Sequence, residues 1–138
     1  MNIKRVIAAA IVATIVGFIY SWVTCGWLFQ WVYTLEPTNV WKPMEDITTW
    51  MVWINIGGFI LNVILVGVFA YLYKGIPFKG IKKGFCFGLM VWLVGTLPEM
   101  FSNYMMFTVN TTVIIYWIFN ALIEYLILGA VIAAVYKK

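Results

Sequence analysis

Four long apolar segments divide this chain and constrain its fold more than any other feature. They cover residues 6–31, 49–73, 84–108 and 112–136. Each exceeds the length of about 18 residues that is typical of a membrane-spanning helix. Helices satisfy their own backbone hydrogen bonds in lipid, whereas a β-barrel would need short alternating strands separated by turns. The sequence therefore predicts an all-α, polytopic membrane protein with four transmembrane helices in a bundle.

The composition supports this interpretation and excludes several other classes of protein. Hydrophobic residues make up 64 % of the 138 residues and charged residues only 10 %. A soluble domain of this length leaves too much surface in water to tolerate that balance. A soluble enzyme, a nucleic-acid-binding domain and a disordered chain are thus excluded. At about 20 residues per span, the chain has room for one transmembrane domain and no separate soluble domain.

The cationic residues are distributed asymmetrically, and this predicts the orientation of the helices. If the helices alternate, eight of the nine Lys and Arg residues fall on one side of the membrane, at the N-terminus, in loop 74–83 and at the C-terminus. The ninth, Lys42, lies in loop 34–48 together with three acidic residues. The positive-inside rule therefore places both termini in the cytoplasm.

The two longer loops have different compositions, which predict different roles. The outer loop 34–48 is either a lid or partner-docking segment or a solvated connector, and Glu45 and Asp46 favour the N-terminus of the helix that follows it. The inner loop 74–83 is basic and has residues that end a helix or allow a turn: Gly75, Pro77 and Gly80.

Tryptophan is concentrated toward the predicted outer side. Five indole rings lie at or near that interface, and two more lie slightly deeper in the outer half. An interfacial belt explains such a distribution, because an amphipathic ring suits the headgroup region. An aromatic vestibule that opens outward is the alternative. The residues concerned are Trp27, Trp31, Trp41, Trp50 and Trp53, with Trp22 and Trp117 deeper.

Small residues recur at helical spacing in two of the spans. In lipid, where packing and not hydrophobicity drives helix association, such residues let two backbones approach closely. They indicate either packing within the four-helix bundle or an interface between subunits. The candidate packing positions are Ala9, Ala13, Gly17 and Ser21 in the first span, and Gly84, Gly88 and Gly95 in the third.

Two ionisable residues lie inside predicted spans, Glu99 in the third and Glu124 in the fourth. They lie about 13 and 18 Å from the outer ends of their helices, so both are near mid-membrane. Charged residues at such depth are costly, and they usually face an interior, a cavity or each other. Three asparagines fall at overlapping depths and complete the candidate ligand or ion site: Asn62, Asn103 and Asn120.

Pro98 directly precedes Glu99 and predicts a kink in the third span. A proline inside a helix removes one backbone hydrogen bond and frees a carbonyl about one turn earlier, near Val94. Kinks of this kind often accompany a cavity or a site.

The polar residues suit several kinds of chemistry. Two neighbouring carboxyl groups in a low dielectric can share a proton, oxygen ligands suit hard cations, and a glutamate in an aromatic cavity can pair with a cationic solute. The alternative is structural, with protonated glutamates and asparagines holding helices together. The sequence does not identify a particular metal, and a Cu(I) site of methionines is less expected than ordinary methionine packing.

The residues that the sequence lacks narrow the function further. There is no His, which excludes His-ligated metal sites and His-based acid–base catalysis. Cys25 and Cys86 lie at different depths on different helices and cannot form a disulfide. We expect no cofactor, and catalysis is less expected than binding because no nucleophile–base pair is evident.

The chain resembles a family of small four-span bacterial membrane proteins of unknown function. The resemblance rests on Gly17-Phe18-Ile19-Tyr20 with Trp27, on Gly88-Leu89 and Pro98, and on the run from Asn120 to Gly129-Ala130. It covers most of the chain and implies a bacterial or archaeal cytoplasmic membrane. It implies no activity.

Together these observations predict a small integral protein of a prokaryotic inner membrane. Its expected role is to bind or transport a cation, a proton or a small cationic solute through Glu99, Glu124 and the asparagines. The alternative is a non-catalytic accessory or assembly subunit of a larger membrane complex, with the same polar residues joining helices. The expected partners are the lipid bilayer and either further copies of the chain or a larger complex, with no nucleic acid.

Overall fold

The computed structural model describes residues 2–43 and 46–136, and over these ranges the chain is helical without any strand. Glu45, Lys137 and Lys138, whose charges contributed to the predicted orientation and to the predicted start of the second helix, lie outside the described residues. Four helical segments are long and apolar enough to cross a membrane, which confirms the fold class and makes the chain a multi-pass membrane protein. Each segment begins one to three residues earlier than the sequence predicted.

Two of the four segments contain a π-helical turn. The first consists of α1 (Ile3–Val23) and η1 (Thr24–Leu28), and a 3-10 helix, η2 (Gln30–Thr34), follows it. The second is α2 (Ile47–Leu72). The third consists of α3 (Ile81–Val91), η3 (Trp92–Thr96) and α4 (Leu97–Met106), and the fourth is α5 (Thr111–Val135).

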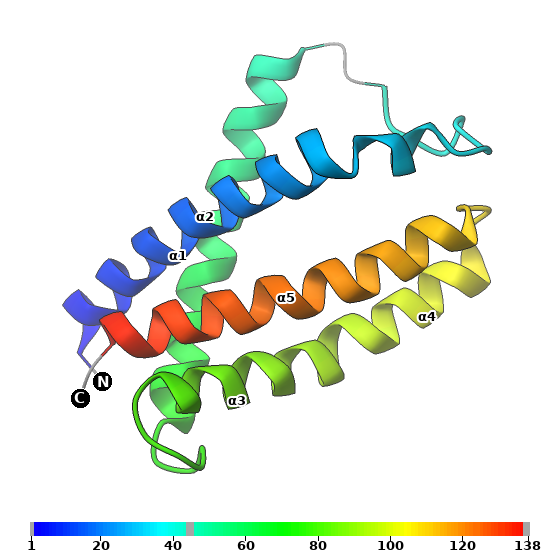
Figure 1. Cartoon of the computed structure of the whole chain (residues 1–138). Coiled ribbons are helices and arrows are strands. Elements are labelled where there is room, and N and C mark those ends of the chain that lie inside the picture. Colours follow the sequence, from blue (N-terminus) through cyan, green and yellow to red (C-terminus); the bar gives the residue numbers. More distant parts are fainter. Residues whose placement is uncertain (1, 44–45, 137–138) are drawn as a thin grey trace.

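Three of the segments lie side by side, and the fourth crosses them. In Figure 1, α5 lies between α1 on one side and the α3–α4 segment on the other, while α2 passes behind them at a steep angle. The start of α1 and the end of α5 lie at one end of the molecule with the 73–80 loop, and the loop before α2 and the α4–α5 connection lie at the other. We call these the inner and the outer end, respectively. The arrangement is therefore a three-helix layer with one crossing helix.

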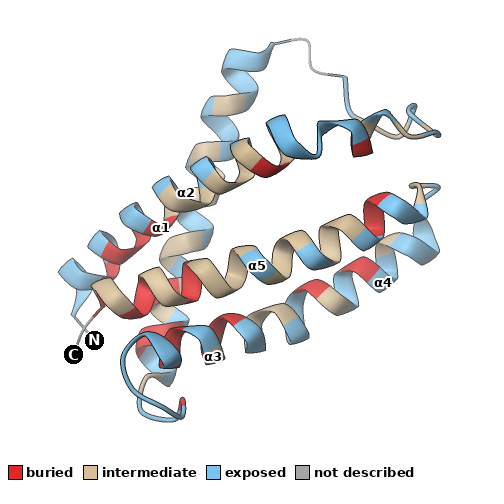
Figure 2. Cartoon of the chain, in the orientation of Figure 1, coloured by how far each residue is buried: buried red, intermediate tan, exposed pale blue. Residues whose placement is uncertain are grey.

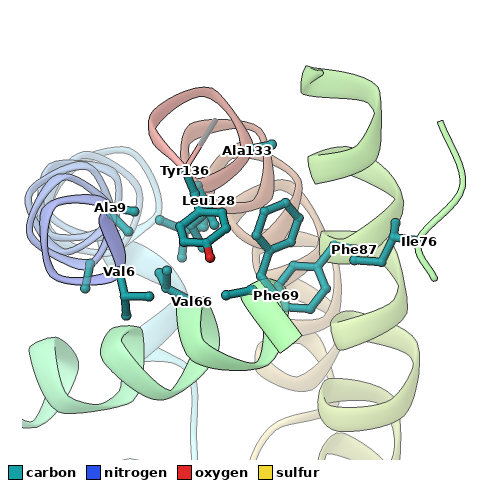
Figure 3. Close-up of a cluster of buried hydrophobic side chains, with 13 residues drawn as sticks. Val6, Ala9, Val66, Phe69, Ile76, Phe87, Leu128, Ala133 and Tyr136 are labelled. Carbon is teal, nitrogen blue, oxygen red and sulfur yellow. The ribbon is translucent and has the colours of Figure 1, made fainter. Parts of the chain in front are cut away.

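The apolar core is concentrated at the end of the molecule where α2 crosses the layer. Phe69 of α2 is fully buried and packs against Phe87 of α3 and Tyr136, with ring centroids 5.1 and 6.1 Å away (Figure 3). Val66 beside it is also fully buried. The outer half of α2 is mostly exposed in Figure 2, so this helix is held to the others chiefly through its inner half.

The contact between α3 and α5 depends on three glycines. A Cβ atom on Gly84 would overlap the carbonyl oxygen of Gly129, and one on Gly88 would overlap the carbonyl oxygen of Tyr125. A Cβ on Gly129 would in turn overlap the Gly84 carbonyl oxygen. The two backbones therefore touch directly, as small residues spaced four apart allow in lipid.

The third span loses regular α-helical geometry directly before Pro98. The Leu97 amide bonds the carbonyl of Trp92, five residues back, which defines the π-helical turn η3. Pro98 has no amide proton, and in an α-helix its ring would collide with the carbonyl four residues earlier. A wider turn at this point relieves that collision and rotates α4 relative to α3.

The inner loop is tied to the core by a lysine that the charge argument counted only as a cation. Lys83 is buried, donates a hydrogen bond to the carbonyl oxygen of Tyr73 and places its ammonium group 4.2 Å from the centre of the Tyr73 ring. The turn between them uses Gly80 at a φ of 58°, in the left-handed region that favours glycine. Lys83 thus closes the loop between α2 and α3.

Asp46 caps the N-terminus of α2. Its carboxylate accepts hydrogen bonds from the Thr48 and Thr49 amides at 3.0 and 3.3 Å, and one from the Thr49 hydroxyl. These hydrogen bonds stabilise the charged form and lower the pKa of Asp46 below its ordinary value.

The cap should therefore weaken in acid. Because the folded-state pKa of Asp46 is lowered, its contribution is complete above the unfolded-state pKa and is lost as the pH falls through the folded-state pKa. We expect the Thr48 and Thr49 amides to exchange hydrogen faster in acid than at neutral pH, after correction for intrinsic rates. Asp46→Asn keeps an accepting oxygen without a titrating group, so it should remove the pH dependence. Equal pH dependence in both proteins would contradict this assignment.

Candidate functional site

Polar side chains meet along the contact between α1 and α5. We call this set the polar seam, and its α5 members are spaced four residues apart on one helix face. The Tyr20 hydroxyl donates to Asn120, with Oδ1 at 2.9 Å and the carbonyl oxygen at 3.0 Å. Nearer the outer end, the Cys25 sulfur lies 3.4 Å from the Tyr116 hydroxyl. The members of the seam are Tyr20 and Cys25 from the first segment, and Tyr116, Asn120 and Glu124 from α5, with Gly17 lying opposite Glu124.

Glu124 is the deepest polar member of the seam. It lies about 20 Å along α5 from the helix start at Thr111, near the middle of the span. Its side chain is half-buried and faces Gly17, where an added Cβ would lie 3.8 Å from Oε1. No hydrogen bond or ion pair joins this carboxyl to another residue of the described chain, and the Tyr20 hydroxyl lies within its electrostatic reach. The seam therefore holds an uncompensated carboxyl at mid-membrane.

The outer end of the seam continues into an aromatic cluster. Tyr33 of η2 connects two indoles, because Trp117 donates to its hydroxyl at 3.0 Å and Trp41 donates to its carbonyl at 3.1 Å. The Tyr33 ring also meets the Tyr116 ring edge-on, with centroids 6.2 Å apart. Burial raises the pKa of the Tyr33 hydroxyl, which therefore stays protonated near neutral pH.

A pocket of about 300 Å³ opens beside this cluster, and we call it the outer pocket. Its lining comes from the outer loop, the end of α4, the α4–α5 connection and the first turns of α5. Its lining is more apolar than polar, and none of its lining residues carries a charge. The lining residues are Val40, Trp41, Asn103, Phe107, Thr108, Val109 and Trp117.

The structure separates the two glutamates that the sequence paired. Glu99 lies on the exposed surface of α4, whereas Glu124 faces α1. Tyr125 lies within electrostatic reach of both carboxyl groups, but no hydrogen bond between Glu99 and Glu124 is present in the described chain. The π-helical turn before Pro98 rotates α4 relative to α3, so Glu99 does not face Glu124. A similar depth in the membrane was therefore not enough to bring the two carboxyl groups together.

Of the three asparagines, only Asn120 belongs to the seam. Asn62 donates to the Thr14 hydroxyl at 3.1 Å and so joins α2 to α1. Asn103 lines the outer pocket beside Trp117, which lies about 10 Å before Glu124 along α5. Asn62 faces α1 because α2 crosses the layer and approaches α1 there.

The small residues proposed for packing differ in what they contact. Ala9 and Ala13 are fully buried in the core, and Gly17 faces Leu128 and Glu124 of α5. Ser21 is half-buried. Gly84 and Gly88 form the α3–α5 contact described above. Gly95 has no neighbour within 4 Å of a Cβ built on it, because it lies in the π-helical turn, where the helix face rotates away from the preceding glycines.

The sequence predicted the indoles of the site only as part of an interfacial belt or an aromatic vestibule, and it did not predict a role for the tyrosines. Tyr20, Tyr116 and Tyr33 supply hydroxyl groups to it, and Trp117 and Trp41 orient around Tyr33. A signal was present, since Tyr116, Asn120 and Glu124 repeat every four residues. Reading that repeat as one polar face would have identified Tyr116.

The donor set of the seam suits protons and cations more than transition metals. Within the described residues, no three His, Cys, Asp or Glu side chains come close enough together to hold a metal ion. Comparisons with models of protein families, with curated proteins and with solved structures found no match to this chain. The family resemblance noted from the sequence therefore stays a prediction.

Proposed function

We propose that this membrane protein binds a proton or a small cation at Glu124 and that this binding is part of moving the ion, or a small cationic solute, across the membrane. The observation that carries the proposal is the position of the Glu124 carboxyl, half-buried at mid-span beside Gly17 and without a hydrogen-bond or ion-pair partner among the described residues. An ionised carboxylate in a low-dielectric interior needs hydrogen-bond donors or a cation to stabilise it, and without them it takes up a proton.

The neighbouring groups support this assignment. Gly17 leaves space at the carboxyl that a larger side chain would fill, because even a Cβ there would be in contact with Glu124. One helical turn outward, the hydrogen bond between Tyr20 and Asn120 holds α1 against α5. The hydroxyls of Tyr20 and Tyr116 and the thiol of Cys25 then extend a line of polar groups toward the outer pocket.

Flux measurements on reconstituted protein test the proposal. In liposomes, the wild-type protein should show flux that depends on pH or on the cation, and Glu124→Gln should lower it at least about tenfold, because the neutral amide cannot hold a proton or a cation in the same way. Glu99→Gln is the matched control, since this glutamate lies on the exposed face of α4. It should leave the flux within about twofold of wild type. Equal loss in both variants, or none in Glu124→Gln, would contradict the assignment of Glu124.

The second candidate function is that of an accessory subunit of a larger membrane complex. One observation favours it, namely that the outer half of α2 is mostly exposed outside the packed core (Figure 2). In that case flux stays at background in wild type, and Glu124→Gln changes only the thermal stability of the protein. The same liposome series therefore distinguishes the two functions.

We also propose that both termini face the cytoplasm of a prokaryotic cell. The described cations at the end shared by both termini and loop 73–80 support this orientation, since only Lys42 lies in the outer loop. The outer pocket would then open toward the outside of the cell.

A further inference from the structure

The outer pocket has the dimensions of a small ligand site. Its volume of about 300 Å³ lies at the lower end of the range typical for binding sites of small molecules. It is formed by parts of the chain that are distant in sequence, since Trp41 comes from the outer loop, Asn103 from α4 and Trp117 from α5. Figure 1 shows the outer loop and the α4–α5 connection at the same end of the molecule.

The two indoles of this pocket are fixed by hydrogen bonds that leave only their faces and edges free. Trp41 donates its N–H to the Tyr33 carbonyl, and Trp117 donates its N–H to the Tyr33 hydroxyl. Their ring centroids are 6.0 Å apart, and the ring planes are inclined at 72°. Because both N–H donors are already bonded, the indoles offer the pocket aromatic surface without a free donor, and the faces of such rings carry partial negative charge.

The polar side chain that α4 contributes to the pocket, Asn103, also suits a cationic ligand. The half-buried Asn103 side chain makes no hydrogen bond to another part of the described chain, so its carbonyl oxygen is available to a donor. No cationic residue lines the pocket. An anion would meet aromatic faces without a compensating charge.

We propose that the outer pocket binds an organic ammonium group against the rings of Trp41 and Trp117 that line it. Aromatic faces attract such cations through their quadrupoles, most strongly for tryptophan. The group comes either from a free solute or from the headgroup of a lipid, since the pocket lies at the outer end of the helices. This binding goes beyond the proposed function of Glu124, and it requires no ion flux.

A comparison of choline with 3,3-dimethylbutan-1-ol tests the proposal, because the alcohol has nearly the same shape and no charge. The protein, labelled with 5-fluorotryptophan, is placed in nanodiscs of phosphatidylglycerol alone, and fluorine NMR follows its eight tryptophans during titration. Substitution of Trp41 and of Trp117 by Phe assigns their signals. We expect choline to shift these two signals and to bind about tenfold more tightly than the alcohol.

Two variants and one control test the assignment of the site. Trp41→Leu and Asn103→Leu should each weaken choline binding about threefold or more, and Asn103→Leu serves if the first variant does not fold. Trp27→Leu is the control, because this indole is 69 % exposed and does not line the pocket. Equal affinity for choline and the alcohol, absence of any shift, or wild-type affinity in Asn103→Leu would overturn the proposal.

A second lipid composition identifies the source of the ammonium group. In nanodiscs that contain phosphatidylcholine, a headgroup in the pocket would shift the two tryptophan signals before choline is added, and choline would then shift them little further. Unchanged choline binding in these nanodiscs would instead support a free solute. Because the measurement reports binding alone, its failure would leave the flux of Glu124→Gln untouched, and the reverse is also true.

Discussion

Gly88→Ala is expected to lower the free energy of unfolding by about 3 kcal/mol, although it adds only one methyl group. The Cβ would overlap the carbonyl oxygen of Tyr125, so α3 would have to move away from α5 along their whole contact. Backbone atoms of two packed helices cannot shift as the end of a flexible side chain can. The loss would appear as a lower unfolding midpoint in detergent, followed through the reactivity of the half-buried thiols of Cys25 and Cys86.

Gly57→Ala is the matched control for this substitution. Gly57 lies inside α2, and nothing comes within 4 Å of a Cβ built on it. Alanine has the higher helix propensity by about 1 kcal/mol, so this variant should be as stable as wild type or more stable. Equal destabilisation by the two variants would show that the loss in Gly88→Ala does not come from the close contact between α3 and α5. Destabilisation by Gly57→Ala alone would instead indicate a contact of α2 with a second chain.

Phe69→Ala is expected to release α2 from the other helices at a cost of about 2 kcal/mol. Phe69 is fully buried, and its ring packs against three aromatic side chains, from Tyr73, Phe87 and Tyr136. The expected cost lies below the range of about 3–5 kcal/mol for loss of a buried Phe in a soluble core, because lipid already provides an apolar surrounding and mainly packing contacts disappear.

Thiol labelling of the folded protein measures this release directly. Cys86 packs against the core that contains Phe69, whereas Cys25 lies in the polar seam. We expect maleimide to label Cys86 faster in Phe69→Ala while labelling of Cys25 stays near the wild-type rate. Leu61→Ala, on the same helix but 67 % exposed, should change neither rate. Faster labelling of both thiols would mean that the whole fold loosens and that Phe69 does not act at the α2 crossing specifically.

The helices themselves could be predicted closely from the sequence. An apolar run of more than about 18 residues has one stable form in lipid, because every backbone group must find a hydrogen bond within the segment. The preference for Asp46 at the start of α2 also followed from local chemistry, since a negative charge suits the N-terminus of a helix, whereas its hydrogen bonds to the Thr48 and Thr49 amides came from the structure. Both inferences need only neighbours in sequence.

The candidate site could be predicted only in part. The sequence indicated that Glu124 and Asn120 share a face, because residues four apart on a helix lie above one another. It did not indicate that this face meets Tyr20 of α1 and not Glu99 of α4. Helices that are apolar on all sides carry little information about which face turns inward, so depth could be inferred but partners could not.

The π-helical turn before Pro98 likewise shows that the sequence did not predict which residues pack together. Pro98 indicated an interrupted helix in the third span, but the direction in which α4 rotates depends on the turn that the packed helix adopts. That rotation leaves Gly95 and Glu99 away from the contacts expected for them.

The sequence by itself determined that the chain belongs in a membrane, how many times it crosses, and which residues stay polar inside the lipid. These properties follow from local hydrophobicity and backbone hydrogen bonding, which act over one helix at a time. Only the tertiary structure decided that Glu124 faces α1, that α3 and α5 touch through glycines, and that α2 crosses the layer. In lipid these choices depend on the close fit of particular side chains and backbones, because hydrophobicity does not favour one apolar face over another.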